Sequence, residues 1–198
     1  MLNATAIILA GGKSSRMGTN KALLPVGGEQ NITRLRNRLQ LLFPEVLLVT
    51  NDPETYQFLQ IPITTDRYPG QGPLAGIHAG LDLSSNPYAL VIACDMPFIS
   101  QEIAHYLVEQ AEGFDAVVPR IEGQLHPLFA VYRSALVPVI EECLKSDQLR
   151  MNDLLEQVKV RYIDEKELEN AKLTIGEAFY NMNRPEEYER AQQIAEQE

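Results

Sequence analysis

A glycine-rich segment near the N-terminus carries the clearest chemical signal in the sequence. Residues 4–9 form a short apolar run with the length and β-branched content of a buried strand. Gly11 and Gly12 follow this run, and the cations Arg16 and Lys21 close the segment. Glycines let backbone N–H groups approach a ligand, and cations neutralise the charge of a phosphate. The pattern therefore favours phosphate binding over a plain strand-to-helix turn with solvated charges.

Two widespread phosphate-binding signatures do not fit this segment. A Walker A pattern that ends at residues 12–14 requires glycine at position 7, where this chain has Ile7. The dinucleotide fingerprint G-x-G-x-x-G fails because Gly11 and Gly12 are adjacent and Gly18 lies too far along the chain. The loop is therefore of another kind.

A carboxylate follows the most apolar run of the chain. Residues 88–93 predict a central strand, and Asp95 comes just after it. A carboxylate at this position suits Mg²⁺, with phosphate oxygens and water as the remaining ligands. The alternative is that Asp95 caps the helix that follows, for which Ser100 is also a candidate N-cap.

Strand-like and helix-like segments alternate for most of the chain. The predicted strands are residues 4–9, 45–50, 62–65, 88–93, 116–118, 128–132 and 158–163. The predicted helices are residues 32–43, 73–83, 100–113, 134–144 and 153–157, with a charged helix from Pro185. This alternation predicts an α/β fold of three layers, Rossmann-like, with helices on both faces of a mainly parallel sheet. We expect residues 1–198 to form a single domain, because no repeat or linker-like stretch interrupts them.

The carboxyl ends of the predicted strands mark where a ligand would bind. In open α/β sheets, ligands lie outside these ends. The rule selects the loop over residues 9–21, together with Asn51, Asp66 and Asp95. The loop after Val118 is a further candidate.

Composition excludes several classes of protein. The formal net charge of −10 over 198 residues argues against DNA or RNA as a bulk partner, while a mononucleotide needs only a local basic pocket. No apolar run approaches the length of a membrane span, and the N-terminal run lacks the features of a signal peptide, so we expect a cytoplasmic protein. Cys94 and Cys143 form no C-x-x-C pair and predict buried thiols rather than a zinc or redox site.

Residues 9–24 resemble the N-terminal signature of nucleotidyltransferases, and most closely that of molybdenum cofactor guanylyltransferases, L-A-G-G-x-S-x-R-M-G-x-D-K-A-L-L. The departure is Asn20, where that family commonly has aspartate. Further elements of the family match G-P-L-A-G-I at residues 72–77, D-M-P at 95–97, H-P-L at 126–128 and N-x-N-x-P-E at 181–186.

The resemblance implies a fold of the nucleotide-diphospho-sugar-transferase type and transfer of GMP from GTP to a molybdopterin-type cofactor, with release of pyrophosphate. It implies that the nucleotide is bound by Leu9, Ala10, Gly11, Gly12, Lys21, Asn51, Asp66 and Asp95. It also implies that the acceptor is bound by His126, Asn181 and Asn183. Mg²⁺ on Asp95 is the expected cofactor, and Arg16, Lys21 and Asp95 are the expected catalytic residues.

Alternatives remain open at the level of sequence. A related nucleotidyltransferase would use CTP with a pterin cofactor, or another nucleotide with a sugar phosphate. A nucleotide-binding accessory protein would not turn over at all. Asn183 also suits a helix cap before Pro185. Exchange of substrate or product with molybdoenzymes or cofactor-synthesis proteins would need a transient contact, and no stretch of the sequence identifies its surface.

Overall fold

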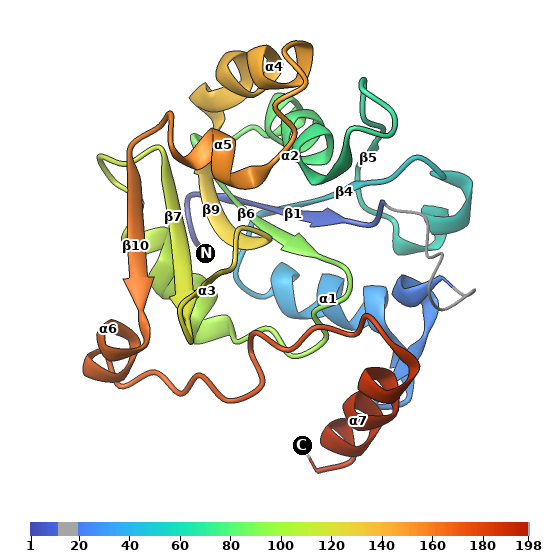
Figure 1. Cartoon of the computed structure of the whole chain (residues 1–198). Coiled ribbons are helices and arrows are strands. Elements are labelled where there is room, and N and C mark those ends of the chain that lie inside the picture. The colour runs from blue at the N-terminus through green and yellow to red at the C-terminus, as the bar shows by residue number, and fades with distance from the viewer. Residues whose placement is uncertain (12–19, 198) are drawn as a thin grey trace.

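An eight-stranded sheet forms the centre of the protein (Figure 1), which a computed structural model describes over residues 1–11 and 20–197. Its order is β10 (Val160–Asp164), β7 (Ala116–Ile121), β9 (Phe129–Arg133), β6 (Tyr88–Ala93), β1 (Thr5–Leu9), β4 (Glu45–Val49) and β5 (Ile63–Thr64). The short strand β8 (Gln124–Leu125) pairs with β7. Neighbouring strands are parallel except at β9 and β8, which run antiparallel to their partners. The predicted mainly parallel sheet is therefore confirmed.

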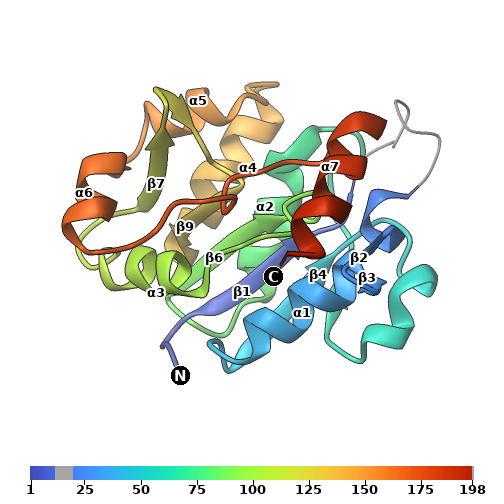
Figure 2. The same ribbon diagram turned by 90° about the horizontal axis from the view of Figure 1, so that it is seen from below.

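Helices cover both faces of the sheet (Figures 1 and 2). One face carries α2 (Gly72–Leu83), α4 (Val137–Lys145) and α5 (Met151–Leu155), and the other carries α1 (Asn31–Gln40), α3 (Gln101–Glu109) and α6 (Glu165–Asn170). The last helix, α7 (Pro185–Ala195), contacts the hairpin of β2 (Pro25–Val26) and β3 (Glu29–Gln30). Three layers result, as predicted. Among the described residues, no helix has the length and apolar content to cross a membrane.

Strand β1 is apolar after Thr5, and its place in the sheet explains this composition. All five of its residues are buried, because β1 lies between β4 and β6 and is covered on both faces. Ala6 and Ile8 belong to the core under α1 and α3, whereas Ile7 and Leu9 belong to the core under α2 and α4. A central parallel strand lacks a solvated face, so it carries no alternation of polar and apolar residues.

Several short elements were not predicted. They are α6, β8, the β2–β3 hairpin and the 3₁₀ helices η1 (Lys21–Leu23) and η2 (Glu54–Leu59), whereas η3 (Ser134–Leu136) falls within the predicted helix over residues 134–144. Helix α6 is mostly charged and buries only Leu168, so it has no apolar stripe to identify it. The strand predicted over residues 116–118 is too short. Strand β7 continues to Ile121, because its end pairs with β8, with Arg120 opposite Leu125.

Gly80 sets the distance between α2 and the sheet. A Cβ atom at this position would lie 2.6 Å from Cγ2 of Ile7 and 2.9 Å from its Cδ1. Ile7 is fully buried in β1 and has little room to move. Close packing of α2 on the sheet therefore explains this small residue.

The Gly80→Ala variant should lose about 1–3 kcal/mol of unfolding free energy, because an added methyl group overpacks a rigid contact. Urea denaturation measures this loss. The matched control is Gly76→Ala, whose Cβ would meet the flexible end of Leu9 at 3.2 Å and should cost less. Equal stability of Gly80→Ala and the wild-type protein would contradict the packing argument.

His78 lies in α2, and its side chain is buried in the core. It is 2% exposed, and neither ring nitrogen has a hydrogen-bond partner among the described residues. The Tyr68 ring lies edge-on to it at 5.6 Å, and the Tyr68 hydroxyl donates to Glu141 of α4. Burial lowers the pKa of His78; the carboxylates of Asp82 and Glu141 oppose this shift, and the cations of Arg67 and Lys145 add to it.

The His78→Leu variant should change how stability depends on pH. The folded protein holds His78 neutral, so the unfolded chain takes up a proton more readily near its ordinary pKa of 6.5. Wild-type stability is therefore lost as pH falls below that value, and the variant should lose less between pH 7.5 and 5. Thermal unfolding at both pH values measures the difference. Parallel curves for the two proteins would show that His78 does not titrate on unfolding.

Candidate active site

Three segments that are distant in the sequence meet beyond the carboxyl end of β6. The loop after β6 carries Asp95, η1 carries Lys21, and the segment before α7 carries Asn183. The Lys21 ammonium donates to Oδ1 of Asn183 at 2.8 Å, and the Met182 N–H donates to the Asp95 carbonyl at 2.8 Å. The segment that joins α6 to α7 runs along the lower side of the molecule as Figure 1 shows it. Two predicted catalytic residues and one predicted acceptor residue thus share one site.

One carboxylate oxygen of Asp95 accepts no hydrogen bond from the described residues. Its Oδ1 atom is buried and has no hydrogen-bond partner within the described residues. Burial raises the pKa of Asp95, the Lys21 charge counteracts this shift, and Glu187 adds to it. Helix α3 is capped by Ser100, whose Oγ accepts from the Ile103 N–H, so the alternative role of Asp95 as a cap is wrong.

These features fit a hard cation. A buried carboxylate oxygen without a donor is the ligand that Mg²⁺ prefers. Across residues 1–11 and 20–197, no group of three or more histidine, cysteine, aspartate or glutamate side chains is placed to hold a metal. A magnesium ion on Asp95 would therefore take its other ligands from substrate phosphates and water, as this ion often does.

Asn20 fixes the short helix from which Lys21 projects. Its Oδ1 accepts from the Ala22 N–H at 3.1 Å and so caps η1. Its Nδ2 donates to the Tyr56 hydroxyl at 2.8 Å. An aspartate could cap η1 in the same way but has no N–H for Tyr56. The departure from the family signature therefore leaves the support of Lys21 intact.

Asn51 and Asp66 meet at the ends of β4 and β5. Nδ2 of Asn51 donates to Oδ2 of Asp66 at 2.7 Å, and the Asp66 N–H lies 3.3 Å from Oδ1 of Asn51. The other carboxylate oxygen of Asp66 is buried and has no partner among the described residues. Asn51 thus orients Asp66 so that one oxygen stays available to an N–H donor of a ligand.

The predicted nucleotide loop is described only in part. Gly12 and Arg16 lie outside the described residues. The Leu9 carbonyl accepts from the Cys94 N–H at 3.0 Å, and the Ala10 N–H donates to the Val49 carbonyl at 2.9 Å. These groups extend the sheet beyond β1. Gly11 is exposed, and no atom of the described residues lies within 4 Å of where its Cβ would be.

The predicted acceptor residues His126 and Asn181 both contact Phe179. The His126 ring lies 4.7 Å from the Phe179 ring, and Nδ2 of Asn181 donates to the Phe179 carbonyl at 3.2 Å. Burial lowers the pKa of His126, so its imidazole is neutral at pH 7. Asn183 contacts Lys21 instead. Because α7 has Arg184 at its N-cap, the alternative role of Asn183 as the cap is wrong.

Three residues that support the site were missed in the sequence: Asn31, Phe179 and Glu187. Asn31 is fully buried, and its Nδ2 donates to the Cys94 carbonyl at 2.6 Å, next to Asp95. No sequence pattern marks this asparagine. Glu187 follows Arg184 by three residues, which is the spacing of a capping box, but arginine is not an N-cap residue of that sequence signature, so no signal marked Glu187 in the sequence.

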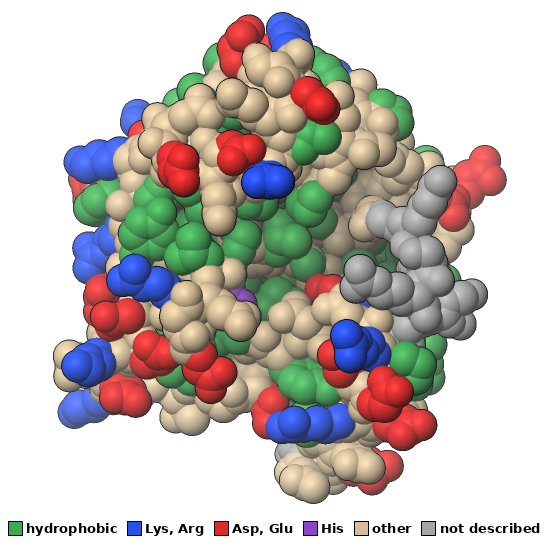
Figure 3. Space-filling view, in the orientation of Figure 1, with side chains coloured by type: hydrophobic (Ala, Val, Ile, Leu, Met, Phe, Trp, Pro, Cys, Tyr) green, Lys and Arg blue, Asp and Glu red, His purple; other side chains and the backbone are tan. Residues whose placement is uncertain are grey.

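The molecule is hollowed on the face shown in Figure 3. Hydrophobic side chains line the floor of this hollow, and one histidine lies among them. Charged side chains stand around its margin. A substrate with an apolar ring system and charged phosphates would suit such a surface.

Comparisons with known proteins identify the family of this chain. The MobA-like NTP transferase domain matches residues 6–162. A protein of Pelotomaculum thermopropionicum named "Probable molybdenum cofactor guanylyltransferase" is 43% identical over 99% of this chain and 95% of its own length. The chain belongs to this family. A relative of the same name from Carboxydothermus hydrogenoformans is also 43% identical, over 98% of each chain.

Solved structures place the fold within the same family. Molybdopterin-guanine dinucleotide biosynthesis protein A from Archaeoglobus fulgidus superimposes with a TM-score of 0.85 and 25% identity, over 98% of this chain and 100% of that one. A CMP:2-keto-3-deoxy-manno-octonic acid synthetase shares the fold with a TM-score of 0.75 at 15% identity, over 98% of each chain. The expected nucleotide-diphospho-sugar-transferase fold is thus confirmed, as is the resemblance to molybdenum cofactor guanylyltransferases.

The Asp95→Asn variant should be as stable as the wild-type protein, or more stable by about 0.5–2 kcal/mol, because functional groups often cost stability. Burial raises the pKa of Asp95, so ionisation disfavours the folded state once the pH exceeds the ordinary value of 3.8. The neutral amide avoids this cost at pH 7. Thermal unfolding without nucleotide or metal measures it, with exposed Glu189→Gln as the control. A marked loss of stability would show that the carboxylate is a structural group.

Proposed function

We propose that this protein transfers GMP from GTP to the terminal phosphate of a molybdopterin-type cofactor and releases pyrophosphate. The observation that supports this most strongly is the meeting of Lys21, Asp95 and Asn183 in one site. Family membership over nearly the whole chain supports the same reaction, since the relatives are named for it.

The chemistry requires positioning and charge compensation. An oxygen of the acceptor phosphate attacks the α-phosphorus of GTP, and the bond from that phosphorus to the β-phosphate bridging oxygen breaks. The acceptor phosphate is already anionic near neutral pH, so no strong general base is needed. The barrier arises because two anions meet and negative charge grows on the leaving pyrophosphate. Fixed cations and dipoles lower such a barrier.

Lys21 and Asp95 take separate parts in this reaction. The Lys21 ammonium would contact the phosphate chain and offset its charge, and Arg16 is the second cation that we expect there. Asp95 would hold Mg²⁺, which supplies a positive charge at the phosphate oxygens when it is bound. Oδ1 of Asn183 keeps Lys21 beside the carboxylate without neutralising either group.

Asp66 is our candidate for recognition of the base. Its buried Oδ1 lacks a partner among the described residues, and Asn51 holds the other oxygen. An acceptor oxygen in this place suits the N–H edge of guanine. On the acceptor side, neutral His126 and the amide of Asn181 border Phe179, which would contact the pterin as a flat ring.

The Lys21→Ala and Asp95→Ala variants should each lose at least about 100-fold in turnover while remaining folded, because the first removes a cation from the phosphates and the second removes the proposed ligand of Mg²⁺. Pyrophosphate release from GTP in the presence of the cofactor measures turnover. The control is His105→Ala on α3, whose exposed imidazole lies 3.5 Å from the carboxylate of Glu109.

The same assay distinguishes the proposed reaction from its alternatives. Near-wild-type turnover in either site variant would exclude the assigned roles. A clear preference for CTP over GTP would exclude guanylyl transfer. Binding of GTP without any pyrophosphate release would indicate a nucleotide-binding accessory protein.

A further inference from the structure

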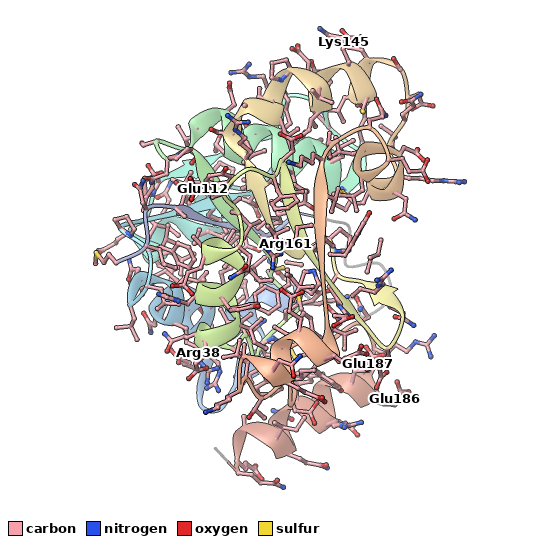
Figure 4. The ribbon with its side chains drawn as sticks, turned by 90° about the vertical axis from the view of Figure 1, so that its left-hand side faces the viewer. Arg38, Glu112, Lys145, Arg161, Glu186 and Glu187 are labelled. Carbon is pink, nitrogen blue, oxygen red and sulfur yellow. The ribbon has the colours of Figure 1, made fainter. Side chains whose placement is uncertain are left out.

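The carboxylate of Glu187, in the first turn of α7, binds the turn that precedes this helix. Glu187 is the third residue of α7, and Figure 4 labels it there with its neighbour Glu186. One oxygen of its carboxylate accepts the N–H of Arg184 at 2.9 Å and also the N–H of Asn183. An ordinary capping box satisfies only the N-cap N–H from this position. The additional bond to Asn183 goes beyond what a helix cap requires.

The residue that receives this additional bond is part of the active site. Its backbone N–H is fixed by Glu187, while its side-chain oxygen accepts from the Lys21 ammonium at 2.8 Å. One residue before it, Met182 is fully buried against Val26, Phe98 and Ala191, and its N–H donates to the Asp95 carbonyl. The turn is therefore anchored on both sides of the Asn183 side chain.

The two anchors constrain different parts of the turn. The bond from Met182 holds the turn to the loop of Asp95, but it leaves rotation of the next peptide group undetermined. The carboxylate of Glu187 removes that freedom because it binds two successive N–H groups. Direction of the Asn183 amide towards Lys21 depends on this second anchor.

We propose that Glu187 is a positioning residue for the transfer reaction: it fixes the backbone of Asn183 so that the Asn183 amide meets Lys21 and borders the acceptor. This inference rests on the proposed function, in which Lys21 contacts the nucleotide phosphates and Asn183 contacts the acceptor. Glu187 itself touches neither substrate. Its loss should impair use of the acceptor and leave affinity for the nucleotide nearly unchanged.

The test compares three substitutions at this position. Glu187→Ala removes both bonds, Glu187→Asp keeps the charge but is too short to hold both N–H groups, and Glu187→Gln keeps an acceptor oxygen of the same reach. We expect kcat/KM for the cofactor to fall by up to about 100-fold in the alanine variant and by less in the aspartate variant. The glutamine variant should recover most of the activity. KM for GTP should stay within about threefold in all three, because η1, capped by Asn20, still carries Lys21 and its charge beside Asp95.

Two controls separate positioning from general loss of stability. Glu189→Ala removes an exposed charge from the same helix. Asp164→Ala removes the cap of α6, where Oδ1 of Asp164 accepts from the Glu167 N–H at 2.9 Å. Both controls should keep wild-type kinetics, and thermal unfolding should show that every variant is folded at the assay temperature.

The outcomes are distinct. A fall in kcat/KM for the cofactor with KM for GTP unchanged, and recovery in Glu187→Gln, supports the proposal. Wild-type kinetics in Glu187→Ala, or an equal loss in Asp164→Ala, overturns it. If Glu187→Ala does not fold, wild-type kinetics in Glu187→Asp overturns it instead. A wild-type protein that releases no pyrophosphate would refute the proposed function, and the positioning role with it.

Discussion

Burial of the Asp95 carboxylate is the constraint on which the rest of the site depends. A buried carboxylate with an unpaired oxygen is costly, and it persists only where the surrounding structure holds it in place. The loop that carries it is bonded to β1 through Cys94, to α1 through Asn31 and to the last segment through Met182. Each layer of the fold except the α2 face thus contributes a bond to this loop. Lys21 reduces the electrostatic cost and is itself held by Asn183.

The sequence predicted the elements that are long and apolar, and the strand ends that carry polar side chains. Parallel pairing of β1 with β4 and β6 brings those ends to one edge, so Asp95 and Asn51 could be assigned to that edge from their positions alone. The contact between Lys21 and Asn183 could not be predicted in this way. It joins residues 162 positions apart, and it depends on how the chain after β10 crosses the sheet. No local pattern specifies that path.

The antiparallel direction of β9 could have been predicted from the length of the segment that precedes it. A parallel crossover needs a dozen or more residues, whereas the segment between β7 and β9 is shorter and contains β8. An antiparallel return is the only connection of that length. This return places the loop of His126 against Phe179, because it folds back beside the last segment. Phe179 itself gave no signal, since an aromatic residue beside Tyr180 outside any predicted element can serve packing as well as binding.

The position of Asn183 in the chain also has a meaning for biosynthesis. Ribosomes synthesise a chain from its N-terminus. The eight strands of the central sheet therefore end at Asp164, before Asn183 and Glu187 are added. Lys21 gains its partner Asn183 only when the segment after β10 docks beside the loop of Asp95. The contact between Lys21 and Asn183 thus depends on a segment that belongs to no strand of the sheet.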